Sequence, residues 1–292
     1  MKVTVVGDSV AWGQGLLDAH KFSSIVNEGL GSGGVAPDML AHSGATIGIR
    51  GATPFTSASG EVPASAPTIL AQVMAAPDPT TTEVVLMNGG INDVNVRVIL
   101  NPFTSFRDLS HKTSRYCHRD MLALLKTATQ RFPSPKTKFA VTGYYPVLSS
   151  DSEPLRAPLL LATHGVSFAP FMYHDAVFDK IVALCTRFWK ESTHCLNRAV
   201  RDCGDSRVHF VDPGFTERNA VFATAPLLWG VKADFSAQDE VIPDRHVACN
   251  VAYPQPIDIV DREACYRASA GHPNVAGAQQ FAVAILASLA PA

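Results

Sequence analysis

The sequence predicts an α/β protein in which a mainly parallel sheet carries helices on both faces. Four short apolar runs each end at Gly, Asn, Asp or Pro, and each is continuously apolar rather than alternating. Strands that are buried on both faces have this pattern. Stretches of helical character separate the runs, and such an alternation is typical of a parallel sheet. Ligands of these sheets bind beyond the carboxyl ends of the strands.

The individual elements follow from the local patterns. Strands are predicted over residues 3–6, 84–87, 139–142 and 208–211, with a weaker fifth strand over residues 39–42. Helices are predicted over residues 16–30, 66–75, 117–132, 181–203 and 275–289. The last helix has one apolar face, and Asn274 precedes it in a position to cap its first turn.

The composition indicates a globular chain and gives no sign of a metal, a cofactor or nucleic acid. Hydrophobic residues make up 47% of the 292 positions and charged residues only 17%, so the chain can bury a large core. The formal net charge of −2 and the absence of a Lys/Arg cluster argue against a nucleic-acid partner. No cysteine and histidine spacing is typical of zinc.

We expect one domain over residues 1–292, with loop insertions around residues 48–64, 149–179 and 214–262. These segments interrupt the alternation of strands and helices and have little periodicity of their own. Long irregular loops in a compact fold are usually functional or mobile. We therefore expect them to form the walls of a substrate pocket at the carboxyl edge of the sheet. The oligomeric state stays open.

Neither a membrane span nor a signal peptide is predicted. A transmembrane helix needs about 20 apolar residues, and no such stretch occurs. The apolar run after Lys2 is too short for the core of a signal peptide. The chain is therefore expected in the cytoplasm, or outside the cell if a leader was removed. Cys249 and Cys265, two of six cysteines, lie in a loop-rich stretch and could pair, which would favour the second alternative.

Ser9 is the first candidate for chemistry. It lies in GDSVAWGQGL, which directly follows the strand at residues 3–6 and leads into a helix. A serine at such a turn exposes its hydroxyl at the carboxyl edge of the sheet, where the helix dipole favours developing negative charge. Alternatively, Asp8 and Ser9 only cap the helix, as these residue types often do.

Two further motifs are placed to meet Ser9. Asn92 lies in NGGINDVN after the strand at residues 84–87, where a side-chain amide can donate to an oxyanion without titrating. His272 lies in SAGHPNVAG just before the last helix, a rigid position that suits a general base. The simpler interpretations are a Gly/Asn turn and one loop histidine among ten.

The order of these motifs resembles that of the SGNH hydrolase family, also called GDSL esterases and lipases. The family pattern is matched by Ser9 in GDSV, Gly44 in HSGAT, Asn92 in GIND and His272 in GHPN. The resemblance implies a three-layer α/β/α sandwich with a central, mostly parallel, flavodoxin-like five-stranded sheet. It also implies a carboxylic ester hydrolase that needs no cofactor and no metal and acts on a small ester.

In the mechanism that the resemblance implies, Ser9 attacks the carbonyl carbon and His272 accepts its proton. The amides of Ser9 and Gly44 and the side chain of Asn92 form the oxyanion hole. The chain departs from the family at Ser269, where an Asp usually orients the histidine. A backbone carbonyl, which would leave a Ser-His dyad, is the first choice for this role, and Asp261 and Glu263 are the rivals.

Two alternatives to a general esterase stay open at this point. The same motifs would serve an O-deacetylase acting on carbohydrates or natural products. Because Ser269 replaces the usual Asp, the second alternative is a non-catalytic binding module with the same fold. A nucleotide-binding protein is disfavoured, because neither GxGxxG nor GxxxxGK[ST] follows any predicted strand.

Overall fold

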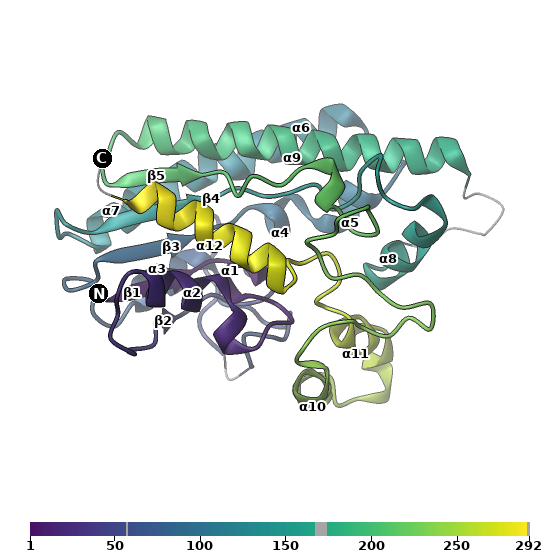
Figure 1. The fold of residues 1–292 in the computed structure, drawn as a ribbon, viewed down its shortest axis with the longest axis horizontal. Helices are drawn as coiled ribbons and strands as arrows, with labels where there is room; N and C mark the ends of the chain where they lie inside the picture. The colour runs from purple at the N-terminus through teal and green to yellow at the C-terminus, as the bar shows by residue number, and fades with distance from the viewer. Residues whose placement is uncertain (57, 167–173, 291–292) are drawn as a thin grey trace.

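A central sheet of five parallel strands organises the computed structural model, which describes residues 1–56, 58–166 and 174–290 (Figure 1). The strands lie in the order β2-β1-β3-β4-β5, which is the flavodoxin-like order. In the register, Val5 lies beside Leu86, and Leu86 lies beside Ala140. The strands are β1 (Val3–Val6), β2 (Asp38–Met39), β3 (Val84–Met87), β4 (Lys138–Thr142) and β5 (Val208–Val211).

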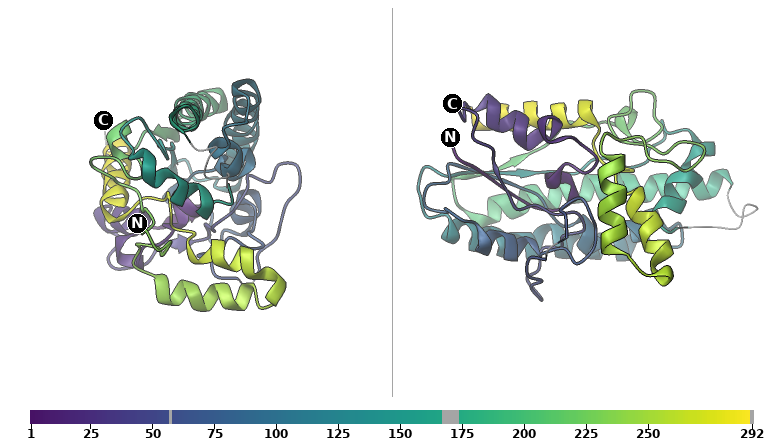
Figure 2. Two further views of the ribbon diagram at one scale, coloured as in Figure 1. Left: turned by 90° about the vertical axis from the view of Figure 1, so that its right-hand side faces the viewer. Right: turned by 90° about the horizontal axis from the view of Figure 1, so that it is seen from below.

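Helices cover both faces of this sheet, so the predicted three-layer α/β/α class is confirmed. On one face α2 (Phe22–Gly29) packs against α12 (Val275–Leu289), and Phe22 stacks on Phe281 with ring centroids 5.4 Å apart. The opposite face carries α3 (Ile69–Ala75), α7 (Met121–Arg131) and α9 (Asp175–Cys203) (Figure 2, right). The side chains of β1, β3 and most of β4 are buried between the two layers.

The predicted helices exist, but several boundaries differ. The helix predicted at 16–30 is a 3-10 turn (Asp18–His20) followed by α2. The helix predicted from residue 66 begins at Ile69, because Thr68 caps it by accepting a hydrogen bond from the Ala71 amide. The helix predicted at 117–132 is instead a π-helix (Ser114–Asp120) followed by α7. The fifth strand is shorter than predicted and lies earlier in the chain.

Short helices follow the strands at the carboxyl edge of the sheet. They are α1 (Ser9–Trp12) after β1, and α4 (Ile91–Val94), α5 (Val96–Leu100) and α6 (Phe106–Thr113) after β3. A 3-10 turn (Pro154–Arg156) and α8 (Ala157–Thr163) follow β4 within the loop expected at 149–179. Residues 167–173 of that loop lie outside the described residues, as does Ser57 of the loop expected at 48–64.

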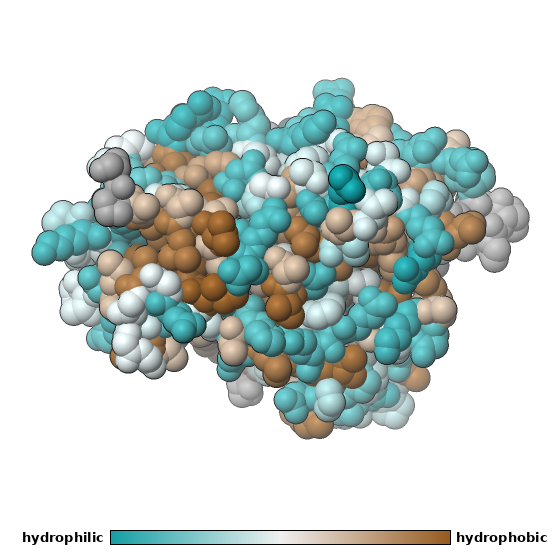
Figure 3. All heavy atoms as spheres, in the orientation of Figure 1, coloured by the Kyte–Doolittle hydropathy of each residue, from teal (hydrophilic) through white to brown (hydrophobic). Residues whose placement is uncertain are grey.

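The segment at 214–262, expected to be a loop, instead contains helical structure. After a 3-10 turn (Glu217–Asn219), α10 (Ile242–Ala252) and α11 (Ile259–Tyr266) form a hairpin joined by the 3-10 turn Pro256–Asp258. The disulfide Cys249–Cys265 links the two helices. The hairpin was not predicted, because apolar residues such as Val251 and Val260 face solvent, where Figure 3 shows apolar surface over α10 and α11.

Among the described residues, no helix combines the length and the hydropathy needed to cross a bilayer. The same residues contain no group of three or more His, Cys, Asp or Glu side chains arranged to hold a metal ion.

Candidate active site

Ser9 begins α1 immediately beyond the carboxyl end of β1. The turn that places it there needs a glycine at position 7, whose φ is +148°. A Cβ on Gly7 would lie only 2.3 Å from Asn88 Oδ1 and 2.7 Å from Ala11 Cβ. The next residue, Asp8, caps α1 by accepting a hydrogen bond from the Val10 amide at 2.9 Å. Asp8 therefore provides the cap of α1, which leaves the Ser9 hydroxyl free for another contact.

Buried amides hold the Ser9 turn from the neighbouring elements. Gln72 of α3 accepts a hydrogen bond from the Gly7 amide at 2.7 Å and donates one to the Gly7 carbonyl at 3.0 Å. Asn88, at the end of β3, accepts from the Asp8 amide at 3.1 Å. These contacts use both backbone polar groups of Gly7 and the backbone amide of Asp8, and they fix the backbone that carries Ser9. No local pattern in the sequence marks Gln72, whose amide lies in an otherwise ordinary helix.

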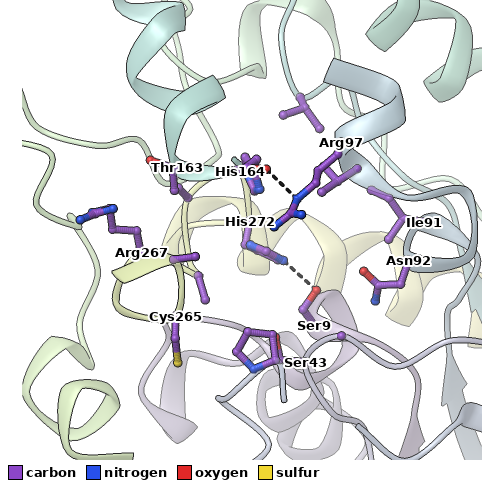
Figure 4. A pocket seen from close by; sticks show the side chains of 18 of the residues that line it. Ser9, Ser43, Ile91, Asn92, Arg97, Thr163, His164, Cys265, Arg267 and His272 are labelled. Atoms are coloured by element: carbon purple, nitrogen blue, oxygen red, sulfur yellow. Dashed lines mark hydrogen bonds between the residues drawn. The ribbon is translucent and has the colours of Figure 1, made fainter. Parts of the chain in front are cut away.

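His272 meets Ser9 directly. Its Nε2 lies 2.7 Å from Ser9 Oγ, although the two residues are 263 positions apart (Figure 4). A backbone hydrogen bond holds the chain around His272, because the Trp229 amide donates to the His272 carbonyl at 2.7 Å. Asn274 caps α12 just beyond, accepting from the Gly277 amide at 3.0 Å. The structure thus brings together the two residues that the motifs single out as nucleophile and base.

The imidazole of His272 is neutral at neutral pH. Removal from water lowers its pKa to about 4, and the charge that His164 carries when protonated and the charge of Arg245 act in the same direction. The carbonyl of Ser269, 3.2 Å from Nδ1, opposes this shift. If the proton sits on Nδ1, that nitrogen donates to Ser269 and leaves the Nε2 lone pair for the Ser9 hydroxyl. This is the tautomer that a general base requires.

Asp261 and Glu263, the two acids considered as alternatives for orienting His272, do not lie against its ring. Glu263 of α11 pairs with Arg267, the residue that follows the helix. Asp261 lines the cavity described below, and its side chain is exposed. Within the described residues, neither carboxylate contacts the His272 ring. The Ser269 backbone carbonyl is the group that meets Nδ1.

Buried charged side chains hold Ser269 in turn. The Ser269 hydroxyl donates to Asp239, and the same carboxylate pairs with Arg245 of α10. Arg245 is completely buried, and its Nε lies 3.7 Å from Glu61 Oε1. Glu61 accepts hydrogen bonds from the Gly15 amide at 3.0 Å and from two side chains that follow Ser9, those of Trp12 and Gln14. A continuous set of polar contacts therefore connects the His272 loop with the segment after α1.

The two segments also pack closely. Gly15 has a φ of +84°, and a Cβ at this position would lie 2.6 Å from Ser269 Cβ and 2.9 Å from Asp239 Cβ. Any larger residue at position 15 would push the His272 loop away from α1. Asp239 and Arg245 were not among the candidates from the sequence, because their segment has no periodicity and nothing local marks their pairing with position 269.

Gly44 and Asn92 lie on the other side of Ser9. Both line the same cavity as Ser9 and His272. Gly44 has a φ of +79°, a left-handed conformation that favours glycine. In the described part of the chain, nothing accepts a hydrogen bond from the backbone amide of Ser9 or of Gly44. Asn92 Nδ2 donates to the Ala45 carbonyl at 2.9 Å, which orients the amide and leaves its second proton free.

Asp93, next to Asn92, is tied to the Gly44 loop. Its carboxylate accepts from the Ile47 amide at 3.1 Å and 3.2 Å. Loss of hydration raises the pKa of Asp93 to about 7, and the nearby Asp8 and Asp120 add to the shift. Asp93 therefore joins the loop that carries Gly44 to the helix that carries Asn92.

A cavity of about 280 Å³ opens over Ser9 and His272. Its walls come from segments far apart in the sequence, including α5, the end of α8 and α11. Residues of the expected insertions at 48–64, 149–179 and 214–262 contribute to them, among them Pro63, Thr163 and Tyr253. Ile91, Val96 and Val147 make part of the lining apolar.

Comparison with known proteins gives a few distant likenesses. No protein-family model and no curated protein matches the chain. One solved structure that resembles it is a carbohydrate esterase, described as having an active site with divergent catalytic and non-catalytic binding functions. The identity is 12% and the TM-score 0.38, and the match covers 72% of this chain. It covers 55% of the esterase, so this chain spans about half of that protein's length.

A second solved structure is the native aryl esterase of M. smegmatis. The identity is 15% and the TM-score 0.38, with 75% of this chain and 92% of the aryl esterase covered.

Proposed function

We propose that the chain is a serine hydrolase of the SGNH type, which cleaves carboxylic ester bonds through an acyl-enzyme on Ser9. The observation that carries the proposal is the 2.7 Å contact between His272 Nε2 and Ser9 Oγ, next to two backbone amides that have no acceptor within the described part of the chain. A nucleophile within hydrogen-bond reach of a neutral base, beside free donors, is the arrangement that acyl transfer needs.

In the first step, Ser9 Oγ attacks the ester carbonyl carbon while its proton passes to His272 Nε2. The carbonyl oxygen becomes an oxyanion, which receives hydrogen bonds from the Ser9 amide, the Gly44 amide and Asn92 Nδ2. When the carbon–oxygen bond to the alcohol breaks, His272 returns the proton to the leaving oxygen. The alcohol departs, and the acyl group stays on Ser9.

In the second step, His272 takes a proton from a water molecule that attacks the acyl-enzyme. The same three donors hold the second oxyanion. Its collapse releases the carboxylic acid, and His272 returns the proton to Ser9 Oγ. The water thus supplies the hydroxyl group of the acid, and its other proton replaces the one that Ser9 gave to the alcohol, so the enzyme returns to its starting state.

We further propose that His272 acts in a dyad whose orientation depends on backbone rather than on a third catalytic acid. The Ser269 carbonyl accepts a hydrogen bond from the Nδ1–H of His272, and Asp239 with Arg245 keeps Ser269 in place. These two residues act through Ser269, so they are positioning residues. A carbonyl stabilises an imidazolium less than a carboxylate does, which leaves a larger share of catalysis to the oxyanion hole.

Substitution Ser9→Ala tests the proposal. We expect the variant to lose hydrolysis of p-nitrophenyl acetate and p-nitrophenyl butyrate, and to lose labelling by a fluorophosphonate probe, with an unchanged circular dichroism spectrum. Ser24→Ala, on α2 and outside the cavity, is the matched control and should still be labelled. Wild-type protein that neither hydrolyses the esters nor reacts with the probe would show a binding module instead.

A further inference from the structure

Arg97 brings a positive charge into the cavity above Ser9 and His272. It belongs to α5, and its Nε donates a hydrogen bond to the His164 carbonyl at 3.0 Å. A guanidinium has five N–H donors, so this contact leaves the two terminal nitrogens free. Among the residues that the structure describes, no carboxylate forms an ion pair with Arg97.

The other charged side chains of the cavity, those of Arg267 and Asp261, offer no free positive charge. The guanidinium of Arg267 forms an ion pair with Glu263, so its charge is neutralised nearby. Asp261 lies on α11 near Tyr253: loss of hydration raises the pKa of that phenol, and the charge of Asp261 adds to the shift. The positive charge without a counterion therefore lies on the α5 side of the cavity, and a negative charge lies on the α11 side.

Arg97 is directed toward the reacting atoms. Figure 4 shows its side chain reaching from α5 toward His272 and Ser9, with the bond to His164 drawn as a dashed line. The contact with the His164 carbonyl fixes the direction of the guanidinium, and the virtual Cβ of Gly165 would lie 3.3 Å from its central carbon. The buried Nε2 of His164 has no hydrogen-bond partner among the described residues, so a second polar group is available on this side.

We propose that Arg97 binds an anionic group of the substrate, so that the ester cleaved at Ser9 carries a carboxylate, sulfate or phosphate close to its carbonyl. The inference rests on the proposed esterase function and names the substrate class of the same site. A planar guanidinium with two free nitrogens matches such groups in a bidentate manner. The carboxylate of Asp261 disfavours an anion on the opposite side, which restricts the anionic group to the α5 side.

The anionic group belongs to either the alcohol or the acyl part, and paired substrates distinguish the two. For the alcohol part, 4-acetoxybenzoate is compared with its neutral analogue 4-acetoxybenzamide. For the acyl part, mono-p-nitrophenyl adipate is compared with p-nitrophenyl hexanoate. In one of the pairs we expect wild-type kcat/KM to favour the anion, and Arg97→Gln to lower the ratio of anionic to neutral kcat/KM about tenfold.

Two further variants separate charge recognition from a change in the fold. Arg97→Lys keeps the charge and should restore part of the ratio. Arg107→Gln removes the same charge from an exposed position on α6, outside the cavity, and should leave the ratio as in the wild type. Wild-type hydrolysis of both neutral esters without any preference for an anion would overturn the inference and leave the esterase intact. Loss of all hydrolysis would instead contradict the esterase itself.

Discussion

At the scale of single residues, the chemistry depends on His272 being unprotonated in contact with Ser9. Its surroundings hold the pKa of the imidazole at about 4, against an ordinary value of 6.5. The cost of charging the ring in a poorly hydrated place, close to His164 and Arg245, outweighs the contact with the Ser269 carbonyl. The base is therefore available over a wider acidic range than an exposed histidine would be.

The pH profile of kcat/KM tests this property. Because the free enzyme loses its base only when His272 is protonated, we expect the acid limb to have a midpoint at about 4 rather than 6.5. The measurement is initial rates of p-nitrophenyl ester hydrolysis from pH 3.5 to 8, with tryptophan fluorescence recorded at each pH to follow folding. An acid limb with a midpoint above 6, on folded protein, would contradict the assignment of the pKa.

At the scale of elements, the His272 loop is held by a segment that lies outside the alternating strands and helices. Asp239, which precedes α10, accepts a hydrogen bond from the Ser269 hydroxyl of the loop, and Arg245 of α10 pairs with Asp239. Removing a carboxylate from beside a buried arginine leaves an uncompensated buried charge, which lowers the stability of the folded state. The orientation of His272 therefore depends on an ion pair in the α10 region.

Substitution Asp239→Asn should lower kcat about tenfold with a smaller change in KM, because a shifted base affects the transition state more than ground-state binding. Ser269→Ala, which removes the hydroxyl contact but keeps the carbonyl, should have the same effect to a smaller degree. Asp234→Asn, an exposed acid nearby that contacts Ser236, is the control. Steady-state kinetics decide the outcome, and a rise in KM alone would show a purely structural role.

The disulfide Cys249–Cys265 stabilises the α10–α11 hairpin. It closes a loop between residues 16 positions apart and forms part of a small buried cluster with Val62, separate from the main core. A loop of this size contributes about 3 kcal/mol in the chain-entropy model. Because many apolar residues of the hairpin face solvent, packing alone holds it weakly.

The variant Cys249→Ser/Cys265→Ser should therefore have a lower melting temperature and a higher KM, since α11 lines the cavity. Differential scanning calorimetry and ester kinetics measure the two effects. The control Cys195→Ser/Cys203→Ser changes two free cysteines on α9 and should match the wild type in KM. Equal melting temperatures for the hairpin variant and the wild type would contradict the stabilising role.

At the scale of the whole molecule, groups near the cavity have pKa values shifted in opposite directions. Loss of hydration raises the pKa of both Glu61 and Asp93 to about 7 and lowers that of both His164 and His272 to about 4. The folded protein therefore binds more protons than the unfolded chain at the two acids, and fewer at the two histidines. By linkage, falling pH favours the folded state through the acids and the unfolded state through the histidines.

These effects oppose one another between about pH 4.5 and 6.5, where the unfolded acids are ionised and the unfolded histidines are protonated. Above this range the histidine effect disappears, while Glu61 and Asp93 still ionise in the folded state as pH rises through 7. We expect the free energy of unfolding to be nearly constant in the first range and to fall as pH rises above it. Urea unfolding from pH 4.5 to 9 measures it.

Asp93→Asn removes one of the two acids and should lessen the fall above pH 7, because the amide does not ionise. A variant that parallels the wild type across this range would show that Asp93 is not the group responsible. Asp212→Asn, an exposed acid after β5, serves as the comparison.

The sequence by itself determined the fold class and the main residues of the candidate site. Continuous apolar runs that end at Gly or Asn mark strands buried on both faces, and the carboxyl ends of parallel strands meet at one edge. For that reason Ser9 after β1 and Asn92 after β3 were predicted to lie together. His272 was predicted from its rigid position before a capped helix and from the resemblance of the motif order to the SGNH family.

Only the tertiary structure decided what surrounds these residues. The hydrogen bond of Ser269 with Asp239, the approach of Arg245 to Glu61, and the α10–α11 hairpin have no local periodicity that would mark them. Hydrophobic periodicity reports which face of an element is buried, because burial repeats with the geometry of a helix or strand. A polar pairing between distant segments repeats nowhere in the chain, so it exists only once the backbone brings the two segments into contact.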